Sequence, residues 1–480
     1  MYEKLGQFID GKWQQSSDKG TYEVINPATE EVIGHASKAT SDDVERALQS
    51  AKKGLEVWKK TPPWQRSYII RRIADRMREK QDVLAKWMTL EVGKPLAEAK
   101  AEINGAADIF EWNAEETKRI FGQTVESRFE DTRVHVYYQP VGVVAALSPW
   151  NFPAVLSARK ISTALAAGCS VIIKPDVITP GVVMEMVDIC NECGVPPGVV
   201  NLLSGDPPSI AQQLIASDIV KKISITGSSR VGKLILKQAA DKVQRVTMEL
   251  SGHSPFIVFD DVDINKVADM AITAKFRNNG QVCISPNRFY IQENKKDEFI
   301  NLFVEKTKKL KIGDGMDSSV QLGPLTTKKR LNEVEELVET TKKEGAKVLM
   351  GGRRPAGFNK GYFYEPTIFD DVKDDFTIMK EEPFGPLVPM LSFKNFDEVI
   401  ERANKNDLGL CSYICTNSMD QAHRASELME TGTVAVNTGV VALAEAPFGG
   451  IKQTGYGREG GSTAIKDYLN IKYTHLGLKG

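Results

Sequence analysis

Cys283 is the residue of this sequence best suited to attack a carbonyl carbon, because a thiolate is a strong nucleophile. It ends the segment 276–283, in which an apolar helical pattern gives way to Asn, Asn and Gly. The thiol is therefore expected on a loop or at a helix start. A helix N-terminus or a cationic neighbour lowers the pKa of a thiol below its free value of about 8.5. Most lone cysteines are small buried hydrophobes, so Cys283 by itself is weak support for catalysis.

Glu249 and Asn151 are two polar residues that could assist such a nucleophile. Glu249 follows the apolar residues Val246 and Met248 and precedes a glycine turn. A carboxylate at the end of a strand can act as a general base. Asn151 comes just after another apolar strand, where its amide can donate to a developing oxyanion. Taken singly, an exposed salt-bridging Glu and an ordinary turn Asn are the commoner interpretations.

Lys174 and Ser228 follow two further apolar strands. A Lys at the carboxyl end of a strand lies where doubly wound folds bind ligands. The segment 226–232 joins a strand to a helix, so its backbone N–H groups and the Ser228 hydroxyl can hold a phosphate. The segment is not GxGxxG, so its spacing alone is a weak signal for a dinucleotide, and a cap or turn role is the commoner one.

The elements that must position these residues alternate between helix and strand. A capping box at Thr40 and Asp43 predicts a helix over 40–60. After Pro62-Pro63 a second long helix is expected to run to about Gly93. Further helices are predicted over 98–119, 154–167 and 180–194, and strands over 132–138, 141–147, 170–174, 199–203 and 223–226. Buried strands that alternate with helices predict a parallel, doubly wound α/β sheet.

A second α/β alternation begins with a strand at 256–259. It continues with helices over 264–276, 295–310 and 328–344, ends near the Gly-rich 448–450, and is followed by a strand-like tail over 467–478. The chain is therefore predicted to be α/β, with two doubly wound α/β domains plus a β-strand oligomerisation element. The expected bounds are 1–121 and 140–250 for a cofactor-binding domain, 251–452 for a catalytic domain, and 122–139 and 453–480 for the oligomerisation element.

Composition excludes several classes of protein. The 480 residues contain 62 Lys+Arg and 63 Asp+Glu, so no global field attracts nucleic acid or an anionic membrane. No apolar run approaches the roughly 18–20 residues of a membrane span, and the first residues lack the apolar core of a secretory signal. Cys190 and Cys193 have a CxxC spacing without a second pair, which favours two reduced thiols near a helix end over a metal site. A cytoplasmic protein without a metal is expected.

Together, these motifs resemble the aldehyde dehydrogenase superfamily, in order and in spacing, over nearly the whole chain. The two family signatures fall on 248–255 and 276–283. Further matches lie at 149–153, 174–175, 226–228, 381–386 and 447–450. The resemblance implies the aldehyde dehydrogenase fold and an aldehyde substrate, with a homodimer or homotetramer as the assembly.

The resemblance also implies a mechanism. Cys283 attacks the aldehyde to form a thiohemiacetal, whose oxyanion is held by Asn151 and the Cys283 backbone N–H. Hydride transfer to NAD or NADP leaves a thioester, which Glu249 hydrolyses by activating water. Lys160 and Glu459 match positions proposed for proton relay.

The cofactor site is carried over in the same way. Lys174 is expected at the adenine ribose, Ser228 at the pyrophosphate and Glu382 at the nicotinamide ribose. Val177 stands where strongly NAD-selective members carry Glu, so NADP remains an alternative. Ser251 replaces the first Gly of the usual Glu-Leu-Gly-Gly. The full set of residues assigned to the cofactor is Trp150, Lys174, Ser228, Leu250, Glu382 and Phe384.

Within the superfamily, the sequence is most similar to succinate-semialdehyde dehydrogenase and related ω-semialdehyde dehydrogenases. Arg159 and Arg277 match the two arginines that bind the substrate carboxylate there, a task to which guanidinium is well suited. Ala442 replaces a Ser that also touches the carboxylate, so 2-oxoglutarate and glutarate semialdehyde stay open as substrates. Ser285 replaces the subgroup's second cysteine, so no disulfide switch is expected.

Two other functions remain as alternatives. A CoA-acylating dehydrogenase would pass the acyl group to CoA, but such relatives usually lack the base at Glu249. A non-catalytic structural relative would have lost the nucleophile or the cofactor site, whereas Cys283, Asn151 and Glu382 are all present.

Overall fold

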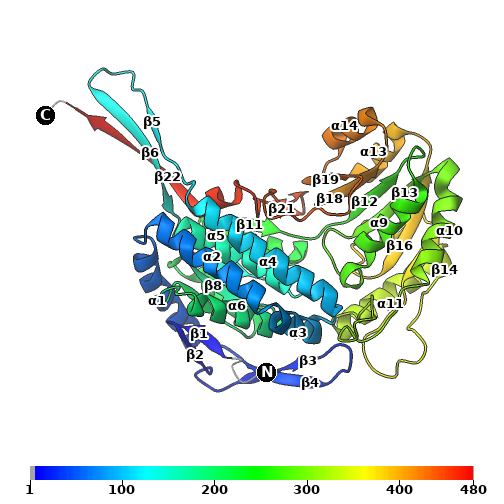
Figure 1. Cartoon of the computed structure of the whole chain (residues 1–480), viewed down its shortest axis with the longest axis horizontal. Helices are drawn as coiled ribbons and strands as arrows, with labels where there is room; N and C mark the ends of the chain where they lie inside the picture. Colours follow the sequence, from blue (N-terminus) through cyan, green and yellow to red (C-terminus); the bar gives the residue numbers. More distant parts are fainter. Residues whose placement is uncertain (1–5, 479–480) are drawn as a thin grey trace.

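Two α/β sheets and a three-stranded arm make up the chain in the computed structural model, which describes residues 6–478 (Figure 1). The first sheet and its helices lie beside the second, and the arm projects from the far side of the first. The α/β class predicted from alternating helices and strands is confirmed.

The first sheet is parallel at its centre. It has the order β2-β1-β9-β8-β7-β10-β11-β21, with only β1, β2 and β21 running antiparallel to their neighbours. Its strands are β1 (Gln7–Ile9), β2 (Lys12–Gln14), β7 (Val143–Leu147), β8 (Ser170–Lys174), β9 (Val200–Leu202), β10 (Val220–Thr226), β11 (Arg245–Glu249) and β21 (Gly455–Tyr456). Every residue of β7 and β8 is buried, as expected for central strands covered on both faces.

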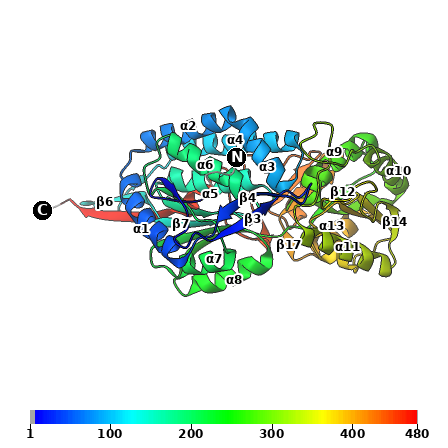
Figure 2. The same ribbon diagram turned by 90° about the horizontal axis from the view of Figure 1, so that it is seen from below.

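Helices cover both faces of this sheet (Figure 2). One face packs against α2 (Pro63–Glu79), α3 (Gln81–Val92), α4 (Leu96–Thr117), α5 (Pro153–Ala167) and α6 (Pro180–Glu192). The other packs against α1 (Ser41–Trp58), α7 (Pro207–Ala216) and α8 (Ser229–Ala240). A small hairpin of β3 (Thr21–Ile25) and β4 (Val32–Ser37) precedes α1.

The second sheet has the order β14-β15-β16-β13-β12-β18-β19 and is parallel except at β14. Its strands are β12 (Ser254–Val258), β13 (Pro286–Gln292), β14 (Lys347–Met350), β15 (Thr367–Asp370), β16 (Leu387–Phe393), β18 (Cys411–Cys415) and β19 (Thr433–Val436). Helices α9 (Ile264–Phe276) and α10 (Lys296–Thr307) cover one face, and α11 (Lys328–Lys343), α13 (Phe396–Asn404) and α14 (Met419–Leu428) cover the other. The short elements are α12 (Thr377–Lys380), β17 (Leu408–Gly409) and β20 (Ile451–Lys452).

The arm is a sheet of β5 (Gln123–Val125), β6 (Thr132–Pro140) and β22 (Leu469–Gly477). β6 and β22 pair antiparallel from Leu469↔Pro140 to Gly477↔Thr132, which joins two distant parts of the sequence. β22 is an edge strand, and its Ile471 and Tyr473 are 70% and 69% exposed.

Several local predictions are confirmed. Thr40 caps α1, accepting a hydrogen bond from the Asp43 backbone N–H while the Asp43 carboxylate accepts from the Thr40 N–H. The bounds of β8 and α9 are those expected from the sequence. No helix among residues 6–478 is both long enough and apolar enough to cross a membrane.

Two predicted elements were wrong in extent. The long helix expected after Pro62-Pro63 is two helices, because the chain leaves helical geometry at Lys80 (φ −92°, ψ 13°). Neither Gly nor Pro marks this break. The tail strand begins at Leu469, because residues 464–468 form a 3₁₀ turn that buries Tyr468.

Candidate active site

The loop that carries Cys283 is shaped by residues in left-handed conformations. It follows the 3₁₀ turn Arg277–Gly280, in which Asn278 and Asn279 have φ of 48° and 54°. Asn tolerates this region better than most residues. Gly280 has φ 74°, and a Cβ there would collide with the Gly385 backbone. The Asn, Asn, Gly run thus ends α9 and turns the chain so that Cys283 lies on a loop, one of the two positions expected.

Asn151 is bound directly to this loop. Its side-chain amide donates to the Gln281 carbonyl at 3.2 Å, and its own carbonyl accepts from Lys94 Nζ at 2.8 Å and Asn278 Nδ2 at 3.0 Å. Both Asn151 and Cys283 line the same cavity. An amide nitrogen carries two hydrogens, so one stays free to donate to an oxyanion formed next to the thiol.

The Cys283 thiol is held in its protonated form. Burial, followed by the carboxylates of Glu382 and Glu249, raises its pKa to about 12, while Arg277 lowers the pKa by less. The direction is opposite to the lowering that a cationic neighbour would give alone. A thiol of this kind needs a base to take its proton before it can attack.

Glu249 ends β11 and is 2% exposed. Both of its carboxylate oxygens are buried without a hydrogen-bond partner among the described residues. Burial first, then the charge of Glu459, raises its pKa well above 4.5, and Lys160 and Arg159 oppose that rise. A carboxylate with a raised pKa is suited to accept a proton near neutral pH.

Lys160 and Glu459 form a buried ion pair beside Glu249. Lys160 Nζ lies 2.5 Å from Glu459 Oε1 and 2.7 Å from Thr226 Oγ1. Ser224 Oγ donates to the same Glu459 oxygen at 3.1 Å. The structure therefore brings together Lys160 and Glu459, the two residues that the resemblance assigned to a proton relay.

A cavity of about 620 Å³ extends from Cys283 along the carboxyl end of the first sheet. Trp150 and Phe384 form one wall, with ring centroids 5.6 Å apart and nearly perpendicular. Phe384 has φ 44°, a strained conformation that is typical of ligand sites. Glu382 also lines this cavity, and burial raises its pKa to about 8 while hydrogen bonds from Gly252 and Ser251 lower it.

The other end of this cavity is suited to phosphate. Ser228 caps α8, accepting from the Val231 N–H, so the positive end of the helix dipole faces the cavity. Three cationic side chains, Arg230, Lys329 and Arg330, line it as well. A long cavity with aromatic rings, a carboxylate and a cationic helix end fits a dinucleotide.

Five of the six residues predicted to bind the cofactor line this cavity: Trp150, Ser228, Leu250, Glu382 and Phe384. Lys174 does not. It ends β8, is 4% exposed, and burial lowers its pKa to about 8 against the pull of Asp176 and Asp206. Asp176 takes the place in the cavity lining that was expected for Lys174.

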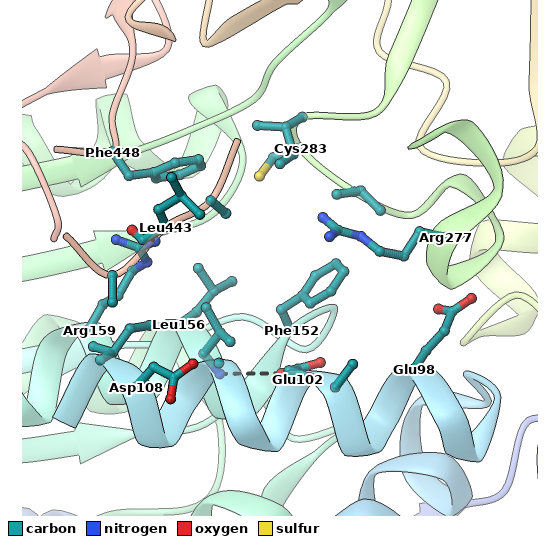
Figure 3. Close-up of a pocket in the computed structure, with 18 of the residues that line it drawn as sticks. Glu98, Glu102, Asp108, Phe152, Leu156, Arg159, Arg277, Cys283, Leu443 and Phe448 are labelled. Atoms are coloured by element: carbon teal, nitrogen blue, oxygen red, sulfur yellow. Dashed lines mark hydrogen bonds between the residues drawn. The ribbon is translucent and has the colours of Figure 1, made fainter. Parts of the chain in front are cut away.

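A second cavity, of about 430 Å³, opens on the other side of Cys283 (Figure 3). Arg277 points into it, packed over the Phe152 ring at 5.0 Å. Arg277 is exposed, and no carboxylate of the described residues pairs with it within 4 Å. It is thus available to a substrate anion.

Arg159 lines the same cavity but is already engaged. It is 2% exposed, donates to the carbonyl of Glu459 at 2.8 Å and to that of Leu443 at 3.5 Å, and packs over Phe448 at 4.9 Å. Its guanidinium therefore joins two parts of the carboxyl-terminal segment around the cavity. The two arginines expected to share a carboxylate are brought to one cavity, but only Arg277 is unpaired.

Sequence reasoning missed the acidic wall that α4 gives this cavity. Glu98, Glu102 and Asp108 line it from one helix. Glu102 pairs with Lys94, and Asp108 pairs with Arg78. The 98/102 spacing is the helical signal that could have revealed it. Sequence reasoning also missed Arg330, which lines the larger cavity. Its position in the first turn of α11, just after the cap Thr327, is the signal that could have revealed it.

Outside these cavities, the remaining cysteines are free thiols. Cys190 lies in the last turn of α6 and Cys193 follows that helix, and both are buried, so they lie near a helix end as expected. Among residues 6–478, no cluster of three or more His, Cys, Asp or Glu side chains is arranged to hold a metal ion.

Comparison with known proteins matches residues 13–474 to the aldehyde dehydrogenase family. A glutarate-semialdehyde dehydrogenase of Pseudomonas putida is 43% identical over 97% of this chain and 96% of its own. An NADP⁺ succinate-semialdehyde dehydrogenase of Escherichia coli is 41% identical over 98% of this chain and 97% of its own. The crystal structure of a Staphylococcus aureus betaine aldehyde dehydrogenase in complex with NAD⁺ is 34% identical, with a TM-score of 0.97 over 99% of this chain and 95% of that one.

Proposed function

We propose, on the premise that this chain belongs to the aldehyde dehydrogenase family, that it oxidises an aldehyde bearing an anionic group to the corresponding acid with NAD or NADP. Succinate and glutarate semialdehyde are the leading substrates, with 2-oxoglutarate semialdehyde as a further candidate. One observation carries the proposal: Cys283 lines both the dinucleotide-sized cavity and the cavity that contains the unpaired Arg277.

The chemistry of the chain's own residues begins at the thiol. Glu249 is close enough to Cys283 to raise its pKa, so it is placed to take the thiol proton. The sulfur then bonds to the aldehyde carbon, and the oxygen becomes an oxyanion. Asn151 and the Cys283 backbone N–H hold that oxyanion.

Bound NAD(P)⁺ supplies a hydride acceptor in this reaction. Trp150 and Phe384 would enclose the nicotinamide, and Glu382 would accept hydrogen bonds from the ribose beside it. The Ser228 end of α8, with Arg330, would hold the pyrophosphate. Loss of hydride leaves the acyl group on Cys283 as a thioester.

Once the thiol proton has passed from Glu249 to solvent, Glu249 acts a second time. It takes a proton from water, the water oxygen bonds to the acyl carbon, and the C–S bond to Cys283 breaks. The acid leaves, and the proton held by Glu249 returns to the sulfur, so that the thiol is ready for another turnover.

The test compares two variants. Cys283→Ala should abolish NAD(P)H production with succinate or glutarate semialdehyde, whereas Glu249→Gln should leave a first burst of NAD(P)H and slow acid release. Wild-type turnover by the Cys283→Ala protein would refute the mechanism.

Two other functions are separated by simple measurements. Turnover that requires CoA would indicate the acylating reaction, which the presence of Glu249 disfavours. A structural relative without activity would bind neither NADH nor NADPH, which titration of tryptophan fluorescence detects.

We also propose roles for the parts of the chain. The first sheet with its helices (1–121 and 140–250) would bind the cofactor, and 251–452 would carry the nucleophile. The oligomerisation element predicted at 122–139 and 453–480, which contains the arm, would join copies of the chain into a homodimer or homotetramer, because β22 is an edge strand with exposed Ile471 and Tyr473. Light scattering of Ile471→Lys, which should shift the assembly toward monomer, tests this role.

A further inference from the structure

Lys94 is a lysine that the fold buries completely. It lies in the short connection between α3 and α4, and its side chain is 0% exposed. Removing an ammonium from water costs free energy unless the protein supplies partners for it. Lys94 lines neither the dinucleotide-sized cavity nor the cavity that contains Arg277. The chain therefore holds a buried charge just outside both binding cavities.

The ammonium of Lys94 has three partners. Its Nζ donates to Glu102 Oε2 at 2.5 Å and to the backbone carbonyl of Asn151 at 2.8 Å. It also lies 3.8 Å from the centre of the Phe152 ring, close enough for a cation–π contact. Two of the three partners belong to the segment that carries the proposed oxyanion donor, so the ammonium is bound directly to that segment.

Glu102 joins Lys94 to the start of α5. This helix begins at a proline, which has no backbone N–H, and its N-cap residue supplies no side-chain hydrogen bond. Glu102 Oε1 instead accepts from the backbone N–H of Ala154 at 2.9 Å and from that of Val155 at 3.3 Å. Its other oxygen binds Lys94. Both carboxylate oxygens are thus used, and one residue of α4 satisfies the first free N–H groups of α5.

Asn151 lies two residues before α5, and its backbone carbonyl accepts two hydrogen bonds. One comes from Lys94 and the other from Asn278 Nδ2 at 3.0 Å. The side-chain amide of Asn151 donates to the Gln281 carbonyl at 3.2 Å, on the loop that leads to Cys283. A side chain meets a reacting atom reproducibly only when its own backbone is held in place. Lys94 is the charged donor of this set, and hydrogen bonds from a charged donor are the stronger ones.

We propose that Lys94 and Glu102 form a positioning pair, which holds the Asn151 amide where the oxyanion forms beside Cys283. The proposal rests on the oxyanion role given to Asn151 above. Lys94 lies outside both cavities, and the two oxygens of Glu102 are engaged inside the protein. The pair therefore acts through Asn151, and neither member reacts with the substrate.

Acylation of Cys283 by p-nitrophenyl acetate tests the pair without any cofactor. The sulfur bonds to the acetyl carbon through a tetrahedral oxyanion, nitrophenolate leaves, and the burst of nitrophenolate gives the acylation rate. Alkylation of the same thiol by iodoacetamide forms no oxyanion and reports only its reactivity and access. Lys94→Met should slow acylation about tenfold or more, since a misplacement of about 1 Å can cost 10²-fold in rate. Alkylation should stay near wild type.

A double-mutant cycle with Asn151→Ala shows whether Lys94 acts through Asn151. Once the amide is removed, Lys94→Met should slow acylation little further, because residues that act as a unit give non-additive losses. Two losses that multiply in full would overturn the proposal, since Lys94 would then act independently of Asn151. Equal slowing of acylation and alkylation in Lys94→Met would also overturn it, because a general disturbance of the fold would explain both.

A second variant separates stability from positioning. Lys94→Met leaves the Glu102 carboxylate buried without its partner, which destabilises the protein. Lys94→Met/Glu102→Gln removes both charges, and Gln keeps an acceptor oxygen for the N–H groups of α5. Its thermal midpoint should lie above that of Lys94→Met, while acylation stays slow. Acylation that recovers together with the midpoint would overturn the proposal, since lost stability alone would then account for the defect.

Lys222→Met is the matched control. Lys222 is also 0% exposed, donates to Thr247 Oγ1 at 2.5 Å, lies 4.5 Å from the centre of the Tyr468 ring, and lines neither cavity. Lys222→Met should lower the thermal midpoint and acylate near the wild-type rate.

Two further outcomes distinguish this inference from the proposed function. Normal acylation in Lys94→Met, with slow acylation in Asn151→Ala, would overturn the positioning pair alone. Normal acylation in Asn151→Ala would refute the oxyanion role in the proposed function, and the positioning pair with it.

Discussion

The side-chain amide of Asn151 donates to the backbone carbonyl of Gln281, 3.2 Å away, and so ties the end of β7 to the loop of Cys283. One amide hydrogen is used in this contact, and the other is left for the oxyanion. Asn151→Ala removes that donor, so kcat for aldehyde oxidation should fall about 10²–10³-fold. Steady-state kinetics measures the loss, and alkylation of Cys283 by iodoacetamide shows whether the thiol stays accessible.

A matched control exists in the same sheet. Asn201 is also fully buried and donates to a backbone carbonyl, that of Gly198, at 2.8 Å, but it lines neither cavity. Asn201→Ala should lower the thermal midpoint and leave kcat near wild type. A kcat within threefold of wild type for Asn151→Ala would exclude the oxyanion role.

Arg277 should decide whether the enzyme prefers a charged aldehyde. It is unpaired, but it is also exposed, and solvent screens an exposed ion pair. Arg277→Met is therefore expected to lower kcat/KM for succinate semialdehyde roughly tenfold and to leave that for uncharged butanal unchanged. Equal losses for both aldehydes would show that Arg277 shapes the cavity without recognising a charge.

Arg159 should behave differently because its guanidinium already bonds the carbonyls of Glu459 and Leu443. Arg159→Met removes the guanidinium that joins these carbonyls, while the Glu459 carbonyl keeps its hydrogen bond from the Phe448 N–H, so the expected cost is about 1–3 kcal/mol in all. The thermal midpoint should fall together with activity on both aldehydes. Selective loss of the charged substrate at an unchanged midpoint would instead place the substrate carboxylate on Arg159.

Much of this site could be predicted because local sequence determines local structure. The Asn278-Asn279-Gly280 run predicted a turn before Cys283, since these residues accept left-handed backbone conformations. The apolar run of β8 predicted a buried strand with Lys174 at its end. Each of these features depends on neighbours within a few residues.

Other features depend on contacts between distant residues and could not be predicted. The pKa of Cys283 is raised by burial and by the carboxylates of Glu382 and Glu249, which lie far apart from it in the sequence. Arg159 is engaged by carbonyls about three hundred positions away along the chain. The break at Lys80 carries no Gly or Pro at all.

The pH dependence of hydrolysis should follow Glu249. A general base works as a carboxylate, so the rate must rise with pH as Glu249 loses its proton. Burial and Glu459 raise the pKa of Glu249, which places this rise well above pH 4.5. Glu459→Gln removes the repelling charge and frees Lys160 to interact with Glu249, and both effects lower that pKa. The acid side of the pH profile for hydrolysis of an acetyl-enzyme, formed on Cys283 with p-nitrophenyl acetate, should therefore move to lower pH.

Glu445→Gln is the control for this shift, because Glu445 is exposed and lines the substrate cavity away from the ion pair. Its profile should match that of wild type. A Glu459→Gln profile that stays in place or moves to higher pH would show that Glu459 does not set the charge of Glu249.

Asp176 should set the choice between NAD and NADP. It lines the dinucleotide-sized cavity beside Lys174, and its carboxylate accepts from the Ile178 N–H at 3.0 Å. A carboxylate at the ribose end accepts a hydrogen bond from a 2′-hydroxyl and repels a 2′-phosphate. Asp176→Ser should therefore raise the ratio of kcat/KM for NADP to that for NAD about tenfold.

Asp206→Ser is the matched control. Asp206 also acts on the charge of Lys174, but it lies outside the cavity as the N-cap of α7, and a Ser at that position can still cap the helix. A ratio that is unchanged in Asp176→Ser, or that changes equally in both variants, would show that Asp176 does not face the ribose.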